Sequence, residues 1–327
     1  MQKNNSRVVF IGAGAIGTAL GNIIAETSRT EVILHSIEES VVDSINNQRI
    51  NFKYFPSFRL DPGIKASTDN SVLYDTELIF LAIPSLFLID YLESIKQFLN
   101  PSAVLVNLAK GFGGGHKTII QCLLEQFPNP VCTLKGPSFA KEIINRTPTG
   151  FTLGCELEEI KTKISDLFKE TTVYLDYTGD MIGVELLSIL KNIYAIVLGI
   201  VDAQFDSPNI RFLILTKAFN EMKNILLIYK GEEETLFKYC GYGDFTMTSL
   251  NDLSRNRTLG LLIGKGFFTE HVSHELVLEG KVAVNIFFEE ISRFRNVSVD
   301  FPIIAELYKI LNQKYDISGF VNTVLKF

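Results

Sequence analysis

The chain has 327 residues, of which 46% are hydrophobic, and it carries a formal net charge of -6 at pH 7. A chain this long and this apolar can bury a large core over two domains, which excludes global disorder. The net negative charge argues against a general nucleic-acid surface or a surface for anionic membranes.

Cysteine and histidine usage and the hydropathy pattern narrow the class further. The four cysteines show no CxxC spacing and no disulfide framework, so we expect reduced thiols in a cytoplasmic protein. The four histidines complete no ligand set with them, and we predict no metal site. We read no signal peptide and no segment suited to crossing a bilayer, so we expect no membrane insertion.

The chain opens on a predicted strand, a glycine-rich turn and a predicted helix. Residues 7–12 (RVVFIG) lead into GAGAIG at residues 12–17, and residues 18–25 read as a helix. This context makes G-x-G-x-x-G a dinucleotide-binding pattern, in which the glycines allow the turn, the approach of a pyrophosphate and close helix packing. We therefore predict that NAD or NADP binds here, at Gly12, Gly14, Ala15, Ile16 and Gly17.

Further apolar runs follow at the spacing of an α/β sheet. Strands are predicted at residues 31–35, 78–83, 103–108 and 131–134, with crossover helices at 41–46 and 86–98. Continuous apolar runs such as LIFLAI suit strands that are buried on both faces of a parallel sheet. The pattern predicts a Rossmann-type, doubly wound α/β domain over residues 1–179.

Candidate ligand contacts come directly after these strands, since ligands of such sheets bind beyond the carboxyl ends. The second strand ends at His35 rather than at an acidic residue, so the sequence does not decide between NAD and NADP. Lys110 precedes a glycine-rich loop, and it is either a ligand contact or an ordinary surface lysine. Gly136 and Ser138 belong to a turn that would offer backbone N–H groups and a hydroxyl in the same crevice.

From about residue 178 the pattern changes to long helical periods, which predicts an all-helical domain over residues 180–327. Helices are expected at residues 180–202 and 209–229. Lys191 lies in the first of them, inside the otherwise apolar segment 183–200, and a helix that is apolar on every face is buried. Burial can lower a lysine pKa by roughly 3–5 units, which suits a catalytic acid and base. The alternative is a core lysine that is neutralised by a structural carboxylate.

Two later segments add polar groups to this helical domain. Asp244 follows two glycines in CGYGD, where the backbone can approach a ligand closely. Ser254 could cap a helix whose first turn carries Arg255, Asn256 and Arg257, and a capped helix start with arginines favours a phosphate site. Hydride transfer to a ketone needs a proton donor, and Lys191 fits that role.

Together these segments resemble the NAD(P)-dependent glycerol-3-phosphate dehydrogenase family over nearly the whole chain. The lysine-asparagine segment, the GD-x-x-x-T block and the SRN-x-x-G block are specific when they occur in this order. The resemblance rests on GAGAIGTAL at residues 12–20, LAIPS at 81–85, NLAKGF at 107–112, GPSFAKEI at 136–143, LLSILKNIYAIVLGI at 186–200, GDFTMT at 243–248, SRNRTLG at 254–260 and LEG at 278–280.

The resemblance implies reversible reduction of dihydroxyacetone phosphate to sn-glycerol 3-phosphate, which feeds phospholipid synthesis in bacteria. It implies that Lys191 is the proton donor and acceptor, and that Arg255 and Asn256 hold the phosphate. The other implied contacts are Lys110, Asn192, Asp244 and Thr248 around the substrate's hydroxyl and carbonyl ends, Gly136, Ser138 and Ser254 at the substrate pocket, and Lys110, Ala140, Arg255, Val277 and Glu279 along the cofactor.

Departures from the family pattern indicate a divergent, bacterial-type member. Ala15 and Ile16 stand where the family usually has serine and tryptophan. Two alternatives therefore stay open, a paralogue that reduces another small phosphorylated ketone and a nucleotide-sensing protein without turnover. The intact Lys191 argues against a sensor, which needs no proton donor. A homodimer is also left open, because an apolar helical domain could dimerise or pack its own core.

Overall fold

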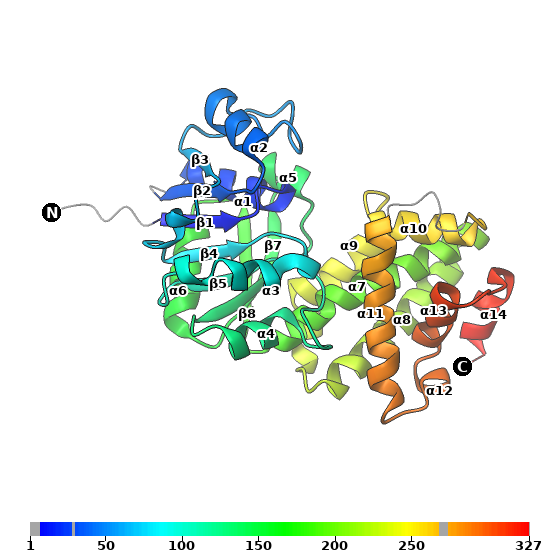
Figure 1. The fold of residues 1–327 in the computed structure, drawn as a ribbon. Helices are drawn as coiled ribbons and strands as arrows, with labels where there is room; N and C mark the ends of the chain where they lie inside the picture. The colour runs from blue at the N-terminus through cyan, green and yellow to red at the C-terminus, as the bar shows by residue number, and fades with distance from the viewer. Residues whose placement is uncertain (1–6, 28–29, 268–273, 327) are drawn as a thin grey trace. The chain divides into compact units, whose positions relative to one another are not determined.

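The computed structural model describes residues 7–27, 30–267 and 274–326, apart from the side chains of residues 274–279. The chain divides into two compact units, Met1–Glu185 and Leu186–Phe327. Figure 1 labels the elements of both units, and each unit is described here by itself.

The first unit is built on an eight-stranded sheet in the order β3-β2-β1-β4-β5-β6-β7-β8. All neighbouring strands are parallel except β6 and β7, which are antiparallel. The strand order reverses between β1 and β4, which makes this the switch point of a doubly wound sheet. The strands are β1 Arg7–Ile11, β2 Glu31–His35, β3 Ile64–Ser67, β4 Leu78–Leu81, β5 Val104–Asn107, β6 Val131–Lys135, β7 Thr149–Gly154 and β8 Val173–Thr178.

Helices cover both faces of this sheet because the strand side chains alternate between two cores. In β1, Val8 and Phe10 belong to one buried cluster, while Val9 and Ile11 belong to the other. The first cluster also contains residues of α1 and α6, and the second contains residues of α3 and α4. The helices of this unit are α1 Ala15–Thr27, α2 Glu39–Asp43, α3 Ser85–Ser94, α4 Ile119–Gln126, α5 Ala140–Ile144 and α6 Glu158–Phe168.

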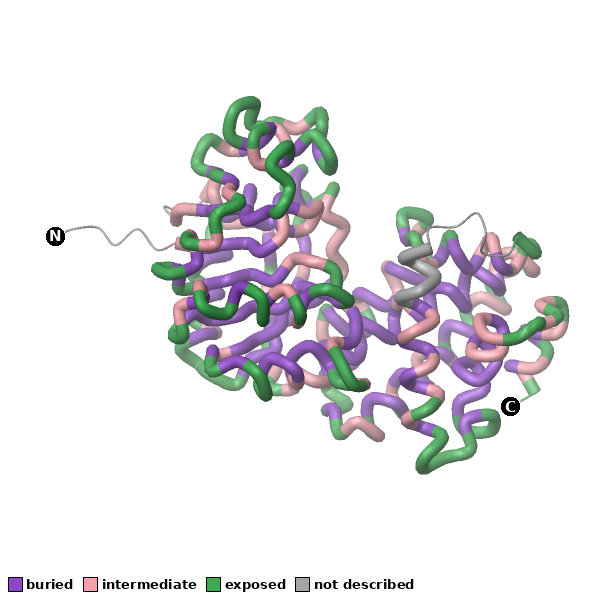
Figure 2. Tube along the Cα trace, viewed as in Figure 1, coloured by how far each residue is buried: buried purple, intermediate pink, exposed green. Residues whose placement is uncertain are grey.

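The predicted Rossmann-type sheet is confirmed, and all five predicted strands are present. Figure 2 shows the central strands of the sheet as buried segments, whereas most residues of β8 are partly or fully exposed. Strands β3, β7 and β8 were not predicted. In β3 only four residues pair, and β7 begins and ends beside glycines, so neither gives a clear strand pattern. The predicted crossover helix at 86–98 ends earlier, since α3 stops at Ser94 and a 3-10 turn, Lys96–Phe98, follows.

The described part of the second unit consists of helices and their connections, as predicted. The two long helices are confirmed as α7 Met181–Gln204, which begins in the first unit, and α8 Pro208–Ile228. Short π-helical and 3-10 turns lie between α8 and α9. The remaining helices are α9 Asp244–Leu250, α10 Arg255–Gly264, α11 His274–Ser292, α12 Val297–Asp300, α13 Pro302–Asn312 and α14 Phe320–Leu325.

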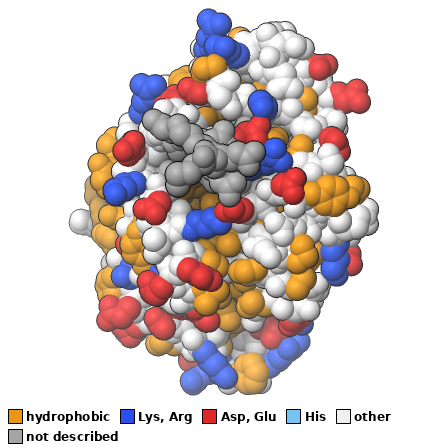
Figure 3. Space-filling model, turned by 90° about the vertical axis from the view of Figure 1, so that its left-hand side faces the viewer, with side chains coloured by type: hydrophobic (Ala, Val, Ile, Leu, Met, Phe, Trp, Pro, Cys, Tyr) orange, Lys and Arg blue, Asp and Glu red, His pale blue; other side chains and the backbone are white. Residues whose placement is uncertain are grey.

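One described helix, α7, is long and apolar enough to cross a membrane by length and composition. Its most apolar window is 94% buried inside the structure, as is typical of a core helix in a water-soluble protein. Acidic and basic side chains are interspersed over the face drawn in Figure 3.

Candidate active site

The glycine-rich loop after β1 is shaped by two of its three glycines. Gly12 has a φ of +113°, and a Cβ there would lie 2.6 Å from the carbonyl oxygen of Ala82, just beyond β4. A Cβ on Gly17 would overlap the carbonyl oxygen of Gly12. In contrast, the nearest described atom to a Cβ on Gly14 would be the carbonyl oxygen of Ala82, at 3.8 Å. Packing within the chain therefore requires glycine at the first and third positions but would accept a Cβ at the second, at an ordinary contact distance.

Asn51, which is distant in the sequence and which no sequence pattern predicted, binds the loop directly through hydrogen bonds. The Asn51 side-chain amide is fully buried and donates to the carbonyl oxygen of Ala13 at 2.8 Å and to Thr18 Oγ1 at 2.9 Å. Ala15 and Ile16, the first residues of α1, pack against the neighbouring core cluster. No local pattern in the sequence marks Asn51, because its partners lie more than thirty residues earlier.

His35 contributes its backbone to this loop rather than a charge. Its carbonyl oxygen accepts a hydrogen bond from the Gly12 N–H at 2.8 Å. The side chain is buried, and burial lowers the pKa of His35. The imidazole is therefore neutral at pH 7 and adds no positive charge at the end of β2.

The residues predicted at the carboxyl edge of the sheet do lie there. Lys110 follows β5 and Ser138 follows β6, and these two strands are parallel neighbours. A Cβ on Gly136 would overlap the carbonyl oxygen of Gly150 in β7, so glycine is required at this turn. The Ser138 hydroxyl donates to the Gly136 carbonyl oxygen at 2.9 Å, and Ala140 begins α5.

A buried polar network supports this edge, and it too was not predicted. Glu185, at the start of α7, accepts hydrogen bonds from Asn107 in β5 and from the Ile120 N–H at the start of α4. Lys135 is 1% exposed, donates to the Asn107 carbonyl oxygen at 2.9 Å and lies 3.8 Å from Glu185. The network ties the ends of β5 and β6 together directly before Lys110 and Gly136.

The second unit brings three of the predicted residues into one buried cluster. Lys191 Nζ forms an ion pair with Asp244 Oδ1 and donates to Thr248 Oγ1 at 3.0 Å. Thr248 Oγ1 also lies 3.3 Å from Asp244 Oδ1, one turn along α9. The three residues are between 0% and 6% exposed. An ammonium held in this way has a fixed direction and is shielded from bulk water.

Local structure around the cluster differs from the prediction in one respect. The glycines before Asp244, where a close approach of the backbone to a ligand was expected, form a π-helical turn, Tyr239–Gly243, that continues directly into α9. Asp244 is therefore a buried residue at a helix start. Asn192 follows Lys191 on α7 and is only partly buried. Successive helix residues point in different directions, so Asn192 faces a different side from the lysine.

The predicted anion-binding segment forms the start of α10. Ser254 caps this helix, and its hydroxyl accepts a hydrogen bond from the Arg257 N–H at 3.3 Å, which confirms the predicted cap. Arg255 is exposed and Asn256 is partly exposed. Arg257 turns inward instead, where it pairs with Asp202 at 2.7 Å and with Asp252. Arg255 and Asn256 are thus accessible at this helix start, where Asp252 and Thr258 are also exposed.

Two predicted cofactor contacts, Val277 and Glu279, belong to the helical backbone of α11. Their side chains lie outside the part of the chain that the structure describes.

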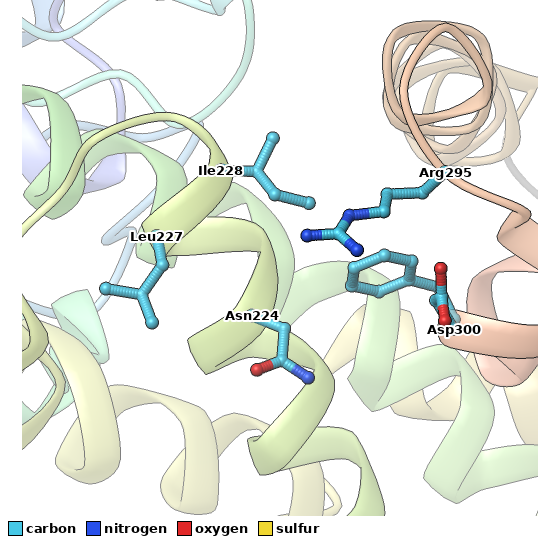
Figure 4. Close-up of a pocket in the computed structure, with 6 residues that line it drawn as sticks. Asn224, Leu227, Ile228, Arg295 and Asp300 are labelled. Carbon is cyan, nitrogen blue, oxygen red and sulfur yellow. The ribbon is translucent and has the colours of Figure 1, made fainter.

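A cavity of about 460 Å³ also lies in the second unit, lined by Asn224, Leu227, Ile228, Arg295, Asp300 and Phe301. Ile228 and Arg295 point toward each other in Figure 4, and none of these six lining residues is a predicted site residue.

A buried carboxylate of the second unit lies apart from the lysine cluster. Glu221 on α8 accepts hydrogen bonds from the Tyr194 hydroxyl at 3.0 Å and from the Ile303 N–H at 2.8 Å. The N–H donor belongs to the first turn of α13, so Glu221 fastens that helix to α7 and α8. Burial raises the pKa of Glu221 to about 7.

Comparisons with known proteins show the family to which this chain belongs. Residues 7–161 match the family model of the NAD-dependent glycerol-3-phosphate dehydrogenase N-terminus, and residues 180–322 match that of the C-terminus. The glycerol-3-phosphate dehydrogenase [NAD(P)+] of Clostridium botulinum is 33% identical over 316 residues, which cover 95% of this chain and 94% of that protein. The corresponding protein of Methanothermobacter thermautotrophicus is 37% identical over 261 residues, covering 79% of this chain and 80% of that one.

Among solved structures, the glycerol-3-phosphate dehydrogenase of Coxiella burnetii superposes with a TM-score of 0.89 at 25% identity and covers 99% of both chains. A ketopantoate reductase from Ralstonia eutropha, at a TM-score of 0.59 and 14% identity, shares only the fold. Together the two family models match residues 7–161 and 180–322, and the two relatives cover 95% and 79% of the chain. The chain therefore belongs to the NAD-dependent glycerol-3-phosphate dehydrogenase family, a family of oxidoreductases that use NAD or NADP.

Proposed function

We propose that this chain catalyses the NAD(P)H-dependent, reversible reduction of dihydroxyacetone phosphate to sn-glycerol 3-phosphate. The observation that carries the proposal is the buried cluster of Lys191, Asp244 and Thr248. A lysine that is buried for structural reasons alone needs only a counterion, whereas Lys191 also donates to Thr248. The relatives that match most of this chain are named glycerol-3-phosphate dehydrogenase [NAD(P)+]. The product would supply phospholipid synthesis in the cytoplasm.

The glycine-rich loop fits the pyrophosphate of a dinucleotide. Its second glycine, Gly14, is not required by packing within the chain, whereas a side chain there would enter the space above the loop. That difference is expected where a backbone must approach a ligand closely. We propose residues 1–179 as the dinucleotide-binding domain, with cofactor contacts at Gly12, Gly14, Ala15, Ile16, Gly17, His35, Lys110, Ala140, Arg255, Val277 and Glu279.

Residues 180–327 would form the substrate and catalytic domain. Bound NAD(P)H supplies the hydride for the carbonyl carbon of the substrate. Lys191 donates a proton from Nζ to the carbonyl oxygen as negative charge develops there, and it takes the proton back in the reverse direction. Asp244 stabilises the ammonium form and fixes its direction, and Thr248 holds a second of its N–H groups. Negative charge on the oxygen is thereby neutralised as it forms.

The phosphate of the substrate would be bound at the start of α10. Arg255 and Asn256 are accessible polar side chains of its first turn, and the Ser254 hydroxyl caps the helix before them. An arginine fork and a helix N-terminus both favour a phosphate group. Asn192, Lys110, Gly136 and Ser138 would complete the substrate pocket. Phosphate binding away from the reacting carbonyl supplies orientation.

The direct test is the oxidation of NADH and of NADPH by the purified protein with dihydroxyacetone phosphate, dihydroxyacetone and a carboxylate analogue. Rapid turnover confined to the phosphorylated ketone is the expected result, and the faster nucleotide identifies the cofactor. Binding of nucleotide without turnover of dihydroxyacetone phosphate would contradict the proposal.

A further inference from the structure

Arg257 is the third residue of α10, and it points away from the exposed pair Arg255 and Asn256. Its side chain is 11% exposed and pairs with two carboxylates, Asp202 on α7 and Asp252 in the turn before α10. The Asp252 side chain is 90% exposed, and ion pairs in water contribute little. The Asp202 side chain is 4% exposed. The ion pair between Arg257 on α10 and Asp202 on α7 is therefore the buried one of the two, and removing one partner of a buried pair is costly.

The same two helices touch directly at a glycine crossing. A Cβ on Gly260 would overlap the carbonyl oxygen of Ile196, and a Cβ on Gly199 would overlap the carbonyl oxygen of Arg257. Backbone is therefore packed on backbone where α10 crosses α7. The same contact continues to the end of α10, where a Cβ on Gly264 would lie 2.8 Å from the carbonyl oxygen of Ile200.

The Arg257–Asp202 pair supplies a second point of attachment. Arg257 lies one turn before Gly260 on α10, and Asp202 lies one turn after Gly199 on α7. This side-chain attachment holds the first turn of α10, whereas the glycine contacts at Gly260 and Gly264 lie in its middle and at its end. Lys191 lies on the same helix as Asp202, so the pair relates the helix that bears the proton donor to the start of α10.

We propose that Arg257 is a positioning residue for phosphate recognition. Arg257 does not bind the substrate itself. It holds Arg255 and Asn256 in the orientation in which they bind the phosphate while Lys191 donates its proton to the carbonyl oxygen. This inference rests on the proposed function. Its consequence is that the preference for a phosphorylated substrate depends on a buried ion pair that lies beneath the phosphate contacts.

The test compares Arg257→Met and Arg257→Lys with two control variants. Arg211 on α8 pairs with the other oxygen, Oδ1, of the same Asp202 carboxylate, so Arg211→Met is a matched control. Asp252→Asn removes only the exposed partner of Arg257. Arg257→Lys keeps the charge but loses the planar fork, and it serves if the methionine variant folds poorly.

The readout is the ratio of kcat/KM for dihydroxyacetone phosphate to kcat/KM for dihydroxyacetone, together with competitive inhibition by inorganic phosphate. We expect the Arg257 variants to lower this ratio about ten- to a hundredfold and to raise the phosphate inhibition constant, because small displacements of binding groups have large effects. The two control variants should keep the wild-type ratio and the wild-type phosphate inhibition constant. A general loss of structure would instead lower kcat/KM for both substrates by the same factor.

Three outcomes decide the matter. A selective loss with phosphate ligands supports the positioning role. Wild-type ratios in both Arg257 variants, or an equal loss with both substrates, would overturn it and leave the proposed function intact. If the wild-type protein shows no preference for dihydroxyacetone phosphate over dihydroxyacetone, the proposed function fails and this inference fails with it.

Discussion

The glycine-rich loop of the first unit and the lysine cluster of the second unit are built in opposite ways. The loop is made of backbone, and two glycines, Gly12 and Gly17, are fixed by packing at the ends of β1 and β4. The cluster is made of side chains from α7 and α9, more than fifty residues apart. A site made of backbone can be recognised in consecutive residues of the sequence, whereas a site made of distant side chains forms only when the chain folds.

This contrast predicts different failures for substitutions in the two regions. A change in the loop should affect nucleotide affinity without touching proton transfer. A change in the cluster should affect turnover while nucleotide binding is kept.

Replacing the proton donor should give the largest effect. In Lys191→Ala we expect kcat for dihydroxyacetone phosphate to fall about a hundred- to ten-thousandfold, the usual range for a general acid. NADH binding, followed by fluorescence titration, should stay at the wild-type value. Lys191→Met, which fills the same space without a charge, should behave alike. Activity that survives both changes would show that another group donates the proton.

The loop should respond in nucleotide affinity. In Gly14→Val we expect the Kd for NADH to rise about tenfold or more, a loss of at least ~1.4 kcal/mol. Gly17→Val is the contrasting variant, since its side chain would overlap the Gly12 carbonyl oxygen and should lower Tm much more than Gly14→Val does. Equal effects of the two changes on Tm would contradict the assignment of Gly14 to a ligand.

Glu221 predicts a pH dependence of stability in the second unit. Its pKa is about 7 in the folded chain, against an ordinary value of 4.5 that applies after unfolding, so the folded state holds the proton more tightly between these values. The stabilisation is fully present below about pH 4.5 and is lost as the pH rises through 7, a change of roughly 1–3 kcal/mol. Urea unfolding at pH 5, 6, 7 and 8 measures it. Glu221→Gln, which does not titrate, should lose this part of the slope, and an unchanged slope would contradict the assignment.

Thr248 should have the smallest effect. Thr248→Val removes one hydrogen bond to the Lys191 ammonium, and we expect kcat to fall about tenfold or less, equivalent to ~1.4 kcal/mol. Ser249, the next residue of α9, is a matched control because its buried hydroxyl has no hydrogen-bond partner among the described residues. Ser249→Ala should leave kcat close to wild type. A larger loss in Ser249→Ala than in Thr248→Val would contradict the proposed role.

Much of the fold could be predicted from the sequence because local patterns determine it. The apolar strands β1, β2, β4, β5 and β6 and the helices α7 and α8 all carry the right period or length. Three strands were missed because a short edge strand and strands flanked by glycine give weak local patterns. Their pairing depends on neighbours that come from other parts of the chain.

The candidate site could be predicted in its residue types but not in its connections. The Ser254 cap follows from local spacing, and the burial of Lys191 follows from its apolar helix. Nothing local shows that Arg257 turns inward while Arg255 stays exposed, since both are arginines at one helix start. Asn51 and Glu185 likewise have partners far away in the chain, so their roles appear only in the folded structure.

The most direct test of the central claim is a single-turnover reaction of the protein with equal amounts of NADH or NADPH and dihydroxyacetone phosphate, followed by phosphorus NMR. We predict that one equivalent of glycerol 3-phosphate appears for each nucleotide oxidised. Bound nucleotide together with unchanged dihydroxyacetone phosphate would contradict the account.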